Sequence, residues 1–260
     1  MTNAASSNVP DSGEVRTSTA DGIATVSFYH PKGNSLPGAL LRAIAGAVEA
    51  AGADATVRVI VLRSEGAGPF CAGASFDELM RIEDSATGQH FFAGFATLIL
   101  AMRRCPCPIV TRVHGKVAGG GVGIVAASDY VVAVRKASLR LSELAVGIGP
   151  FVVGPVIERR TGPGAFAAMA LDAQWRDAEW GERFGLYAQV HETEQELDAA
   201  VTSLSSELAR ANPEATRLLK QVFWQGTDEW DALLAERAAM SGRLVLSDHT
   251  RRAIAAFNNR

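Results

Sequence analysis

The sequence contains little cysteine, and the cysteines present do not follow the pattern of a cross-linked fold. Cys71, Cys105 and Cys107 are three in 260 residues, whereas small secreted domains are dense in paired cysteines. Cys105 and Cys107 are separated by one residue, not by the two of a zinc or redox motif. We therefore expect no disulfide framework and no metal site.

Strong charge of one sign and long apolar runs are also missing. The formal net charge is −3 and no basic block occurs, so nothing predicts binding to nucleic acid or to an anionic membrane. No apolar run approaches the roughly 20 residues of a membrane-spanning helix. The N-terminus lacks the basic and apolar segments of a signal peptide. We expect a cytoplasmic protein.

The length and composition indicate one large domain, or one domain with an appendage, with a substantial core. Hydrophobic residues make up 48% of the chain and charged residues 20%, which is typical of a globular protein. Residues 1–13 are small and polar without periodicity, and we expect a flexible tail there. We place the core in residues 14–200 and a C-terminal helical region in residues 201–260.

Hydrophobic periodicity predicts an α/β fold. Strands are expected at Glu14–Ala20, Ile23–Tyr29, Val57–Leu62, Pro108–Val113, Asp129–Val134 and Ser138–Leu141, and helices near residues 40–52, 76–82 and 89–104. The order strand–helix–strand predicts a largely parallel sheet with right-handed crossovers. From Val152 onward the chain is expected to be mostly helical. Its amphipathic helices would cover their own domain or a neighbouring subunit.

Two glycine-bearing loops follow predicted strands of this sheet. The first is Gly66–Ala74, and the second contains Gly119, Gly120 and Gly121 ahead of an apolar helix. Glycines before a helix let backbone N–H groups approach a ligand, and the helix N-terminus favours negative charge. The carboxyl ends of parallel strands, where both loops fall, are where such sheets bind ligands.

One carboxylate follows the second loop within an otherwise uncharged stretch of the sequence. Glu143 stands in the otherwise uncharged run Leu141–Val146. A donor loop with one such carboxylate predicts a site that transfers a proton beside a polarised carbonyl. The alternatives without a catalytic role are that Glu143 is a surface carboxylate at the end of a strand and that the glycine triplet only makes a tight turn.

At these motifs the chain resembles the crotonase superfamily, which includes the enoyl-CoA hydratases and isomerases. The matching segments are PFCAGASFDEL (Pro69–Leu79), PIVTRVHGKVAGGGVGIVAASDYVVA (Pro108–Ala133), SELAVGIGP (Ser142–Pro150) and HPKGNSL (His30–Leu36). The resemblance implies an α/β fold with a crotonase-like ββα spiral core and a C-terminal helical trimerisation region. It also implies an acyl-CoA thioester substrate and a homo-oligomer, a trimer or hexamer. No cofactor is expected, because coenzyme A is part of the substrate.

The same resemblance assigns roles to particular residues. The backbone N–H groups of Ala74 and Gly120 would form an oxyanion hole for the thioester oxygen. Lys32, Ala72 and Gly73 would contact coenzyme A. The segment PFVVG departs from the glycine-rich turn common in the family and would place Phe151 and Val152 in the wall of the acyl pocket.

The reaction is predicted from a second departure, at Gly123. Hydratases of this family hold water with two glutamates, and the first of these corresponds to Gly123, which has no side chain. The second corresponds to Glu143. Retention of this glutamate alone resembles the family's enoyl-CoA isomerases, which shift a double bond with one acid/base. The branches that use an aspartate near Phe151 do not match.

Two alternatives remain open at this point. One is an enoyl-CoA hydratase or another acyl-CoA lyase or hydrolase, with water held by Glu143 and by a residue near His90, His114 or Phe151. The other is a non-catalytic member that binds acyl-CoA without turnover.

Overall fold

The computed structural model describes residues 13–258 of the chain. Its largest sheet has six strands in the order β1-β2-β4-β6-β8-β10. β1 is antiparallel to β2, and the other neighbours are parallel. The strands are β1 (Glu14–Ala20), β2 (Ile23–Tyr29), β4 (Val59–Ser64), β6 (Ile109–Val113), β8 (Tyr130–Val134) and β10 (Gln189–His191). The tail expected over residues 1–13 lies, except for Gly13, outside the described residues.

Four two-residue strands form a second layer that carries the glycine loops. β3 (Ser35–Leu36) pairs with β5 (Gly73–Ala74), and β7 (Val117–Ala118) pairs with β9 (Leu139–Arg140), both parallel. An isolated bridge between Cys71 and Val117 joins the two pairs.

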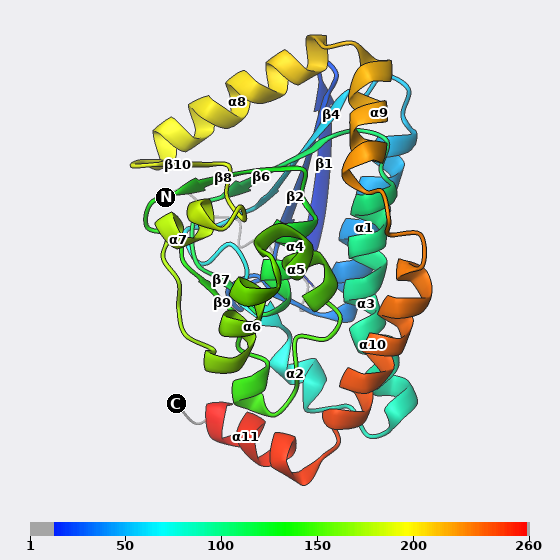
Figure 1. The fold of residues 1–260 in the computed structure, drawn as a ribbon, viewed down its shortest axis with the longest axis vertical. Coiled ribbons are helices and arrows are strands. Elements are labelled where there is room, and N and C mark those ends of the chain that lie inside the picture. The colour runs from blue at the N-terminus through cyan, green and yellow to red at the C-terminus, as the bar shows by residue number, and fades with distance from the viewer. Residues whose placement is uncertain (1–12, 259–260) are drawn as a thin grey trace, which may run out of the picture.

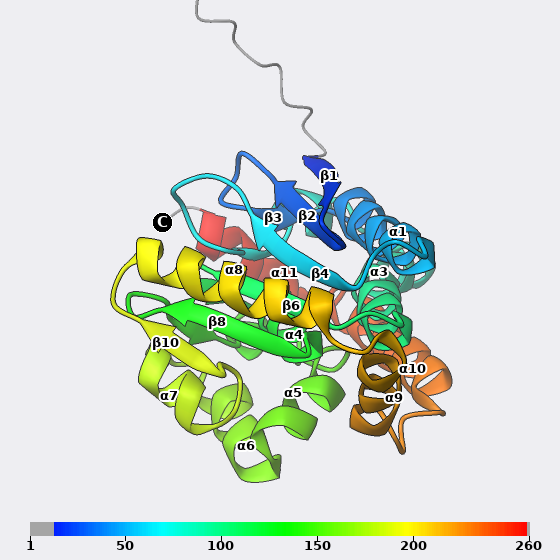
Figure 2. The same cartoon turned by 90° about the horizontal axis from the view of Figure 1, so that it is seen from above.

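The helices pack around these sheets (Figures 1 and 2). α1 packs against α3, α10 lies along α3, and α8 crosses β4, β6 and β8. Within residues 13–258 no helix is both long and apolar enough to span a bilayer. The helices are α1 (Gly38–Ala53), α2 (Phe76–Leu79), α3 (Ser85–Arg104), α4 (Gly120–Ala127), η1 (Leu144–Val146), α5 (Gly154–Thr161), α6 (Pro163–Asp172), α7 (Ala178–Arg183), α8 (Glu194–Arg210), α9 (Pro213–Phe223), α10 (Trp230–Leu244) and α11 (Asp248–Asn258).

Most predicted elements are confirmed, with differences at their ends. β1 and β2 match the prediction to the residue. α3 begins four residues before the predicted Gln89, because the Asp84 carboxylate accepts a hydrogen bond from the Thr87 N–H at 2.7 Å and caps the helix. α2 ends at Leu79, three residues early. The strand β10 was missed, because its three residues are too few for an informative alternation and pair only with β8.

α4 is the buried helix at the centre of the molecule. All eight of its residues are buried, so its small side chains allow neighbouring elements to approach closely. Its N-terminus follows β7 and therefore lies at the layer of short strands.

Candidate active site

Three segments far apart in the sequence lie side by side in the layer of short strands. The Ala118 N–H donates to the Cys71 carbonyl at 2.8 Å, and the Gly119 N–H donates to the Arg140 carbonyl at 2.8 Å. The first glycine loop, the second glycine loop and the strand before Glu143 are thus hydrogen-bonded neighbours. The structure brings together the three motifs that the sequence singled out.

Glycine is required where the two loops touch. Gly119 has φ +52° and Gly73 has φ +96°, a left-handed region that residues with a Cβ rarely adopt. A Cβ at Gly73 would lie 3.2 Å from the Ala118 carbonyl oxygen. The loops therefore meet backbone to backbone.

The two residues predicted to supply backbone donors line the same small cavity. The Ser75 N–H donates to the Leu36 carbonyl at 3.2 Å, so in the extended strand the preceding N–H, that of Ala74, points away from β3. Gly120 is the first residue of α4, and N–H groups of a first helical turn have no acceptor within the helix. Ala74 and Gly120 both line the cavity.

Glu143 presents its carboxylate to this cavity from the start of η1. A Cβ at Gly119 would lie 3.5 Å from Glu143 Oε1, so the carboxylate stands beside the glycine loop. Its Oε2 is enclosed and has no hydrogen-bond partner among the described residues. Burial raises the pKa of Glu143 to about 7. Such a group can both accept and return a proton near neutral pH.

The cavity measures about 40 Å³ and is apolar apart from Glu143 and one serine. The sequence predicted five of its residues, including Phe151 and Val152. It missed the others, which come from α3, α10 and the segment before α5. The lining residues are Ala74, Phe92, Phe95, Gly120, Glu143, Gly149, Pro150, Phe151, Val152, Val153 and Ser241.

Gly123 does not leave an empty place for a second carboxylate. A Cβ there would lie 2.7 Å from the Cβ of Val153, closer than such atoms approach in proteins. The Val153 side chain thus occupies the volume that a side chain at position 123 would need.

A larger groove of about 400 Å³ shares Ala74 with the cavity. Lys32 and Ala72, two of the residues expected to contact coenzyme A, line it, and Gly73 lies between Ala72 and Ala74 in the same segment. Lys32 forms an exposed ion pair with Asp77.

The groove also carries a cationic and aromatic wall that the sequence did not indicate. Lys116, Arg140 and Trp175 line it, and the Lys116 Nζ lies 5.3 Å from the centre of the Trp175 ring. Among the described residues, no cluster of three or more His, Cys, Asp or Glu side chains is placed to hold a metal ion. The groove suits an elongated ligand with anionic groups, and the cavity suits its apolar, reacting end.

A family model described as enoyl-CoA hydratase/isomerase matches residues 18–260. The chain belongs to this family. Its fold is the α/β crotonase fold, with mixed sheets and C-terminal helices. The family implies an acyl-CoA substrate, which fits a groove that ends in a small apolar cavity.

Relatives within the enoyl-CoA hydratase/isomerase family differ in reaction. The methylglutaconyl-CoA hydratase of Rattus norvegicus is 32% identical over 199 residues, which are 75% of this chain and 63% of that protein. A (7aS)-7a-methyl-1,5-dioxo-2,3,5,6,7,7a-hexahydro-1H-indene-carboxyl-CoA hydrolase of Mycobacterium tuberculosis is 30% identical over 207 residues, 80% of this chain and 82% of the relative. The crystal structure of an enoyl-CoA hydratase from Mycobacterium avium matches with a TM-score of 0.84 and 27% identity, over 94% of this chain and 96% of that one.

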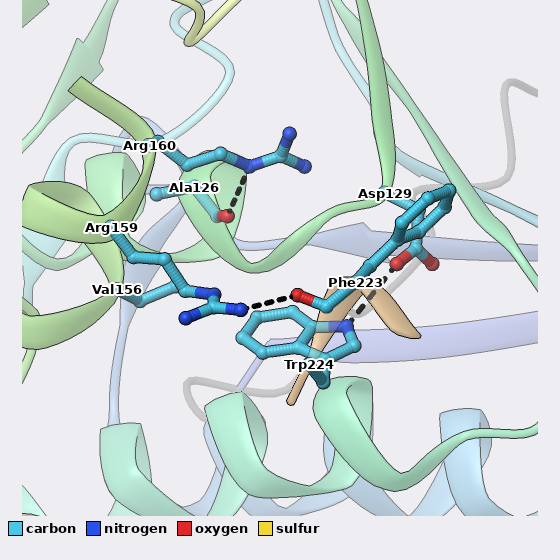
Figure 3. A pocket seen from close by; sticks show the side chains of 7 residues that line it. All are labelled: Ala126, Asp129, Val156, Arg159, Arg160, Phe223 and Trp224. Atoms are coloured by element: carbon cyan, nitrogen blue, oxygen red, sulfur yellow. Dashed lines mark hydrogen bonds between the residues drawn. The ribbon is translucent and has the colours of Figure 1, made fainter. Parts of the chain in front are cut away.

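A separate hollow of about 410 Å³ lies at the opposite end of α4 from Gly120 (Figure 3). Arg160 donates to the Ala126 carbonyl at 3.0 Å, and Arg159 donates to the Phe223 carbonyl at 2.6 Å. Since these guanidinium groups already hold backbone carbonyls, the hollow is a structural junction of α4, α5 and α9. His90 and His114 line neither the cavity nor the groove beside it.

Proposed function

We propose that this enzyme shifts the double bond of an enoyl-CoA thioester and uses Glu143 as its single acid/base. The observation that carries the proposal is the contact between Gly123 and Val153. It fills the position of a second carboxylate, and Glu143 is the one acidic residue that lines the cavity. One carboxylate is sufficient to move a proton between two carbon atoms.

The oxyanion hole of the proposed reaction consists of two backbone N–H groups. Those of Ala74 and Gly120 donate to the thioester oxygen, and the N-terminus of α4 favours the negative charge that develops there. Fixed donors of this kind contribute about 3 kcal/mol each to the stability of the transition state.

Glu143 then moves one proton. Its carboxylate removes a proton from the α carbon of a 3-enoyl thioester, and the electron pair of that C–H bond moves to the thioester oxygen as an enolate. The protonated Glu143 returns the proton to the γ carbon while the enolate collapses, which leaves a 2-enoyl thioester. A pKa of about 7 suits both steps, because neither form of the carboxyl group is strongly favoured at neutral pH.

The substrate's coenzyme A moiety is proposed to occupy the groove. Lys32 supplies a positive charge at its rim, and the small residues Ala72 and Gly73 let backbone approach the pantetheine arm. Lys116 and Arg140 add positive charge along the same wall.

The deciding experiment is incubation with 3-enoyl-CoA and, separately, 2-enoyl-CoA in deuterium oxide, followed by mass spectrometry. We expect a shifted double bond without addition of water. A 3-hydroxyacyl-CoA product would contradict the proposal and favour a hydratase.

Glu143→Gln tests the assigned acid/base. The amide keeps the shape of the side chain but cannot take a proton, so we expect kcat to fall about 10²–10⁴-fold. Glu182→Gln, at an exposed position of α7, is the matched control and should leave kcat unchanged. Full activity of the Glu143 variant would refute its role.

A homo-oligomer, trimer or hexamer, formed through the C-terminal region of residues 201–260 is part of the proposal. The apolar side chains of Leu218, Leu219, Val222 and Phe223 on α9 are about half exposed, which is typical of a surface that meets another chain. Light scattering of the purified protein measures the assembly, and a monomer at micromolar concentration would contradict it.

A further inference from the structure

The size of the cavity limits what can follow the reacting carbons of the substrate. It measures about 40 Å³, whereas an apolar cavity of about 150 Å³ binds one benzene molecule, which has six carbon atoms. Beyond the atoms that react at Glu143, the cavity therefore has room for little more than one or two carbon atoms.

Aromatic rings held against backbone form the walls of this cavity. A Cβ at Gly120 would lie 2.7 Å from Cδ1 of Phe95, and one at Gly149 would lie 2.7 Å from Cε1 of Phe151. Both rings thus rest directly on glycines that line the cavity. Neither ring can move further toward these glycines without displacing backbone.

A third ring supports the wall from behind. Phe91 makes edge-to-face contacts with Phe92 and with Phe95, at centroid distances of 5.2 and 6.2 Å. Phe91 is itself buried, so Phe92 and Phe95 are backed by a ring that is part of the core.

The contact between α3 and α10 borders the cavity at Ser241. A Cβ at Gly88 would lie 2.8 Å from the Cα of Gly242, so the two helices touch backbone to backbone. Ser241, next to this contact, lines the cavity. At the other end of the pair, Arg103 donates to the Thr227 hydroxyl at 2.5 Å, and Arg104 pairs with Asp231. The two helices are held together at both ends, so an acyl chain has no passage between them at these contacts.

The charge of the lining restricts the substrate further. Glu143 is the one ionisable residue among those that line the cavity, and no lysine, arginine or histidine lines it. A carboxylate at the far end of an acyl group would be buried without a partner and close to a second carboxylate. Burial of an unpaired charge is strongly unfavourable.

We infer that the acyl group of the substrate is short and uncharged, with about four to six carbon atoms, and that Phe95 and Phe151 set this limit. The inference rests on the proposed function, because it places the reacting carbons at Glu143.

The test compares kcat/KM for straight 3-enoyl-CoA substrates of increasing length and for one whose acyl chain ends in a carboxylate. We expect the shortest chains to be preferred, with a loss of about tenfold or more for each further pair of carbon atoms. Phe151→Ala should raise kcat/KM for the eight-carbon substrate relative to the four-carbon one. Leu171→Ala, at an exposed position of α6, should leave this ratio unchanged.

Binding measurements separate the failure of this inference from failure of the proposed reaction. Calorimetry with saturated acyl-CoA thioesters reports the length limit whether or not turnover occurs. Tighter binding of short chains, with a product other than the isomer, would refute the reaction and keep the size limit. Equal binding or turnover of ten-carbon chains, or efficient turnover of the carboxylate-bearing substrate, would overturn the inference.

Discussion

The carboxyl group of Glu143 connects activity and stability through one pKa. Burial raises this pKa to about 7, and the proposed first step needs the ionised form. We therefore expect kcat/KM to rise with pH and to level off above an apparent pKa of about 7. A pH–rate profile measures this, and a rate that is flat from about pH 5 to pH 9 would argue against Glu143 as the base.

The same raised pKa predicts how stability changes with pH. Between its ordinary value of 4.5 and about 7, the folded protein keeps the proton on Glu143 while the unfolded chain loses it. Stability contributed by this group is therefore fully present below the lower value and is lost as pH rises through the upper one. Glu143→Gln removes the effect, so its Tm should exceed that of the parent at pH 8 and approach it near pH 5. Thermal unfolding at the two pH values checks the sign.

Gly123 and Val153 form a second residue-scale test. Gly123→Glu places a side chain where the Cβ of Val153 already lies. Overpacking of this kind costs about 1–3 kcal/mol, which lowers Tm. Val153→Ala would not relieve the clash, since alanine keeps the Cβ, but Val153→Gly would. We expect the double variant with glycine at position 153 to recover Tm relative to Gly123→Glu alone. Equal Tm values would mean that Val153 does not fill this space.

At the scale of elements, a hydrogen bond from α11 holds the segment that carries Glu143. The buried Thr250 hydroxyl donates to the Gly147 carbonyl at 2.9 Å, and Gly147 ends η1 in a left-handed conformation. The Val146 and Ile148 N–H groups both donate to the Glu143 carbonyl, at 3.2 and 2.9 Å. Thr250 thus holds the Glu143 segment through Gly147, although it lies more than a hundred residues later in the sequence.

Thr250→Val tests this positioning role. Valine keeps the shape but leaves the Gly147 carbonyl without its donor, and a catalytic group displaced by about 1 Å can lose up to about a hundredfold in rate. We expect kcat to fall about tenfold or more, with KM little changed because the coenzyme A groove is untouched. Thr97→Val is the control, since the exposed Thr97 hydroxyl donates only to Ala93 within α3. A rise in KM with kcat preserved would contradict the positioning role.

At the scale of the whole molecule, one buried ion pair ties the C-terminal helices to the main sheet. The Lys220 Nζ of α9 lies 2.7 Å from Asp129 Oδ2, and both side chains are almost fully buried. The same oxygen accepts a hydrogen bond from the Ile109 N–H at 2.8 Å, at the start of β6. Trp224 Nε1 donates to the other oxygen of Asp129 at 3.3 Å (Figure 3).

Lys220→Met leaves the charge of Asp129 buried and without its ionic partner. Loss of one member of a buried pair costs about 3–5 kcal/mol, so we expect a large fall in Tm. Lys136→Met removes the exposed pair with Glu194, whose side chains are 62% and 45% exposed. Such a pair contributes about 0–1 kcal/mol, and this control should barely shift Tm. Similar Tm shifts for both variants would show that the buried pair stabilises the fold no more than the exposed pair does.

The sequence predicted the parts of the molecule that depend on local pattern or on loop chemistry. The hairpin β1–β2 followed from alternation around Asp21-Gly22, and the motifs around Ala74, Gly120 and Glu143 do converge on one cavity. The strand β10 could not be predicted, because its pairing with β8 is a tertiary interaction.

The remaining cavity residues escaped prediction for a related reason. Phe92 and Phe95 recur at helical spacing in α3, which looks the same whether a helix face meets the core or a cavity. Ser241 is a polar residue of α10 and adds nothing to an apolar pattern. Only the packing of α3 against α10 decides which of these side chains meets a ligand.

The contact of Gly123 with Val153 also has an evolutionary consequence. A mutation that introduces glutamate at position 123 is harmful while valine remains at 153, and a mutation of Val153 to glycine alone opens an empty space in the core. Neither single step improves the protein, although together they would make room for a two-carboxylate site. Under the proposed function, a change from one carboxylate to two therefore passes through a single variant that is less stable than the parent.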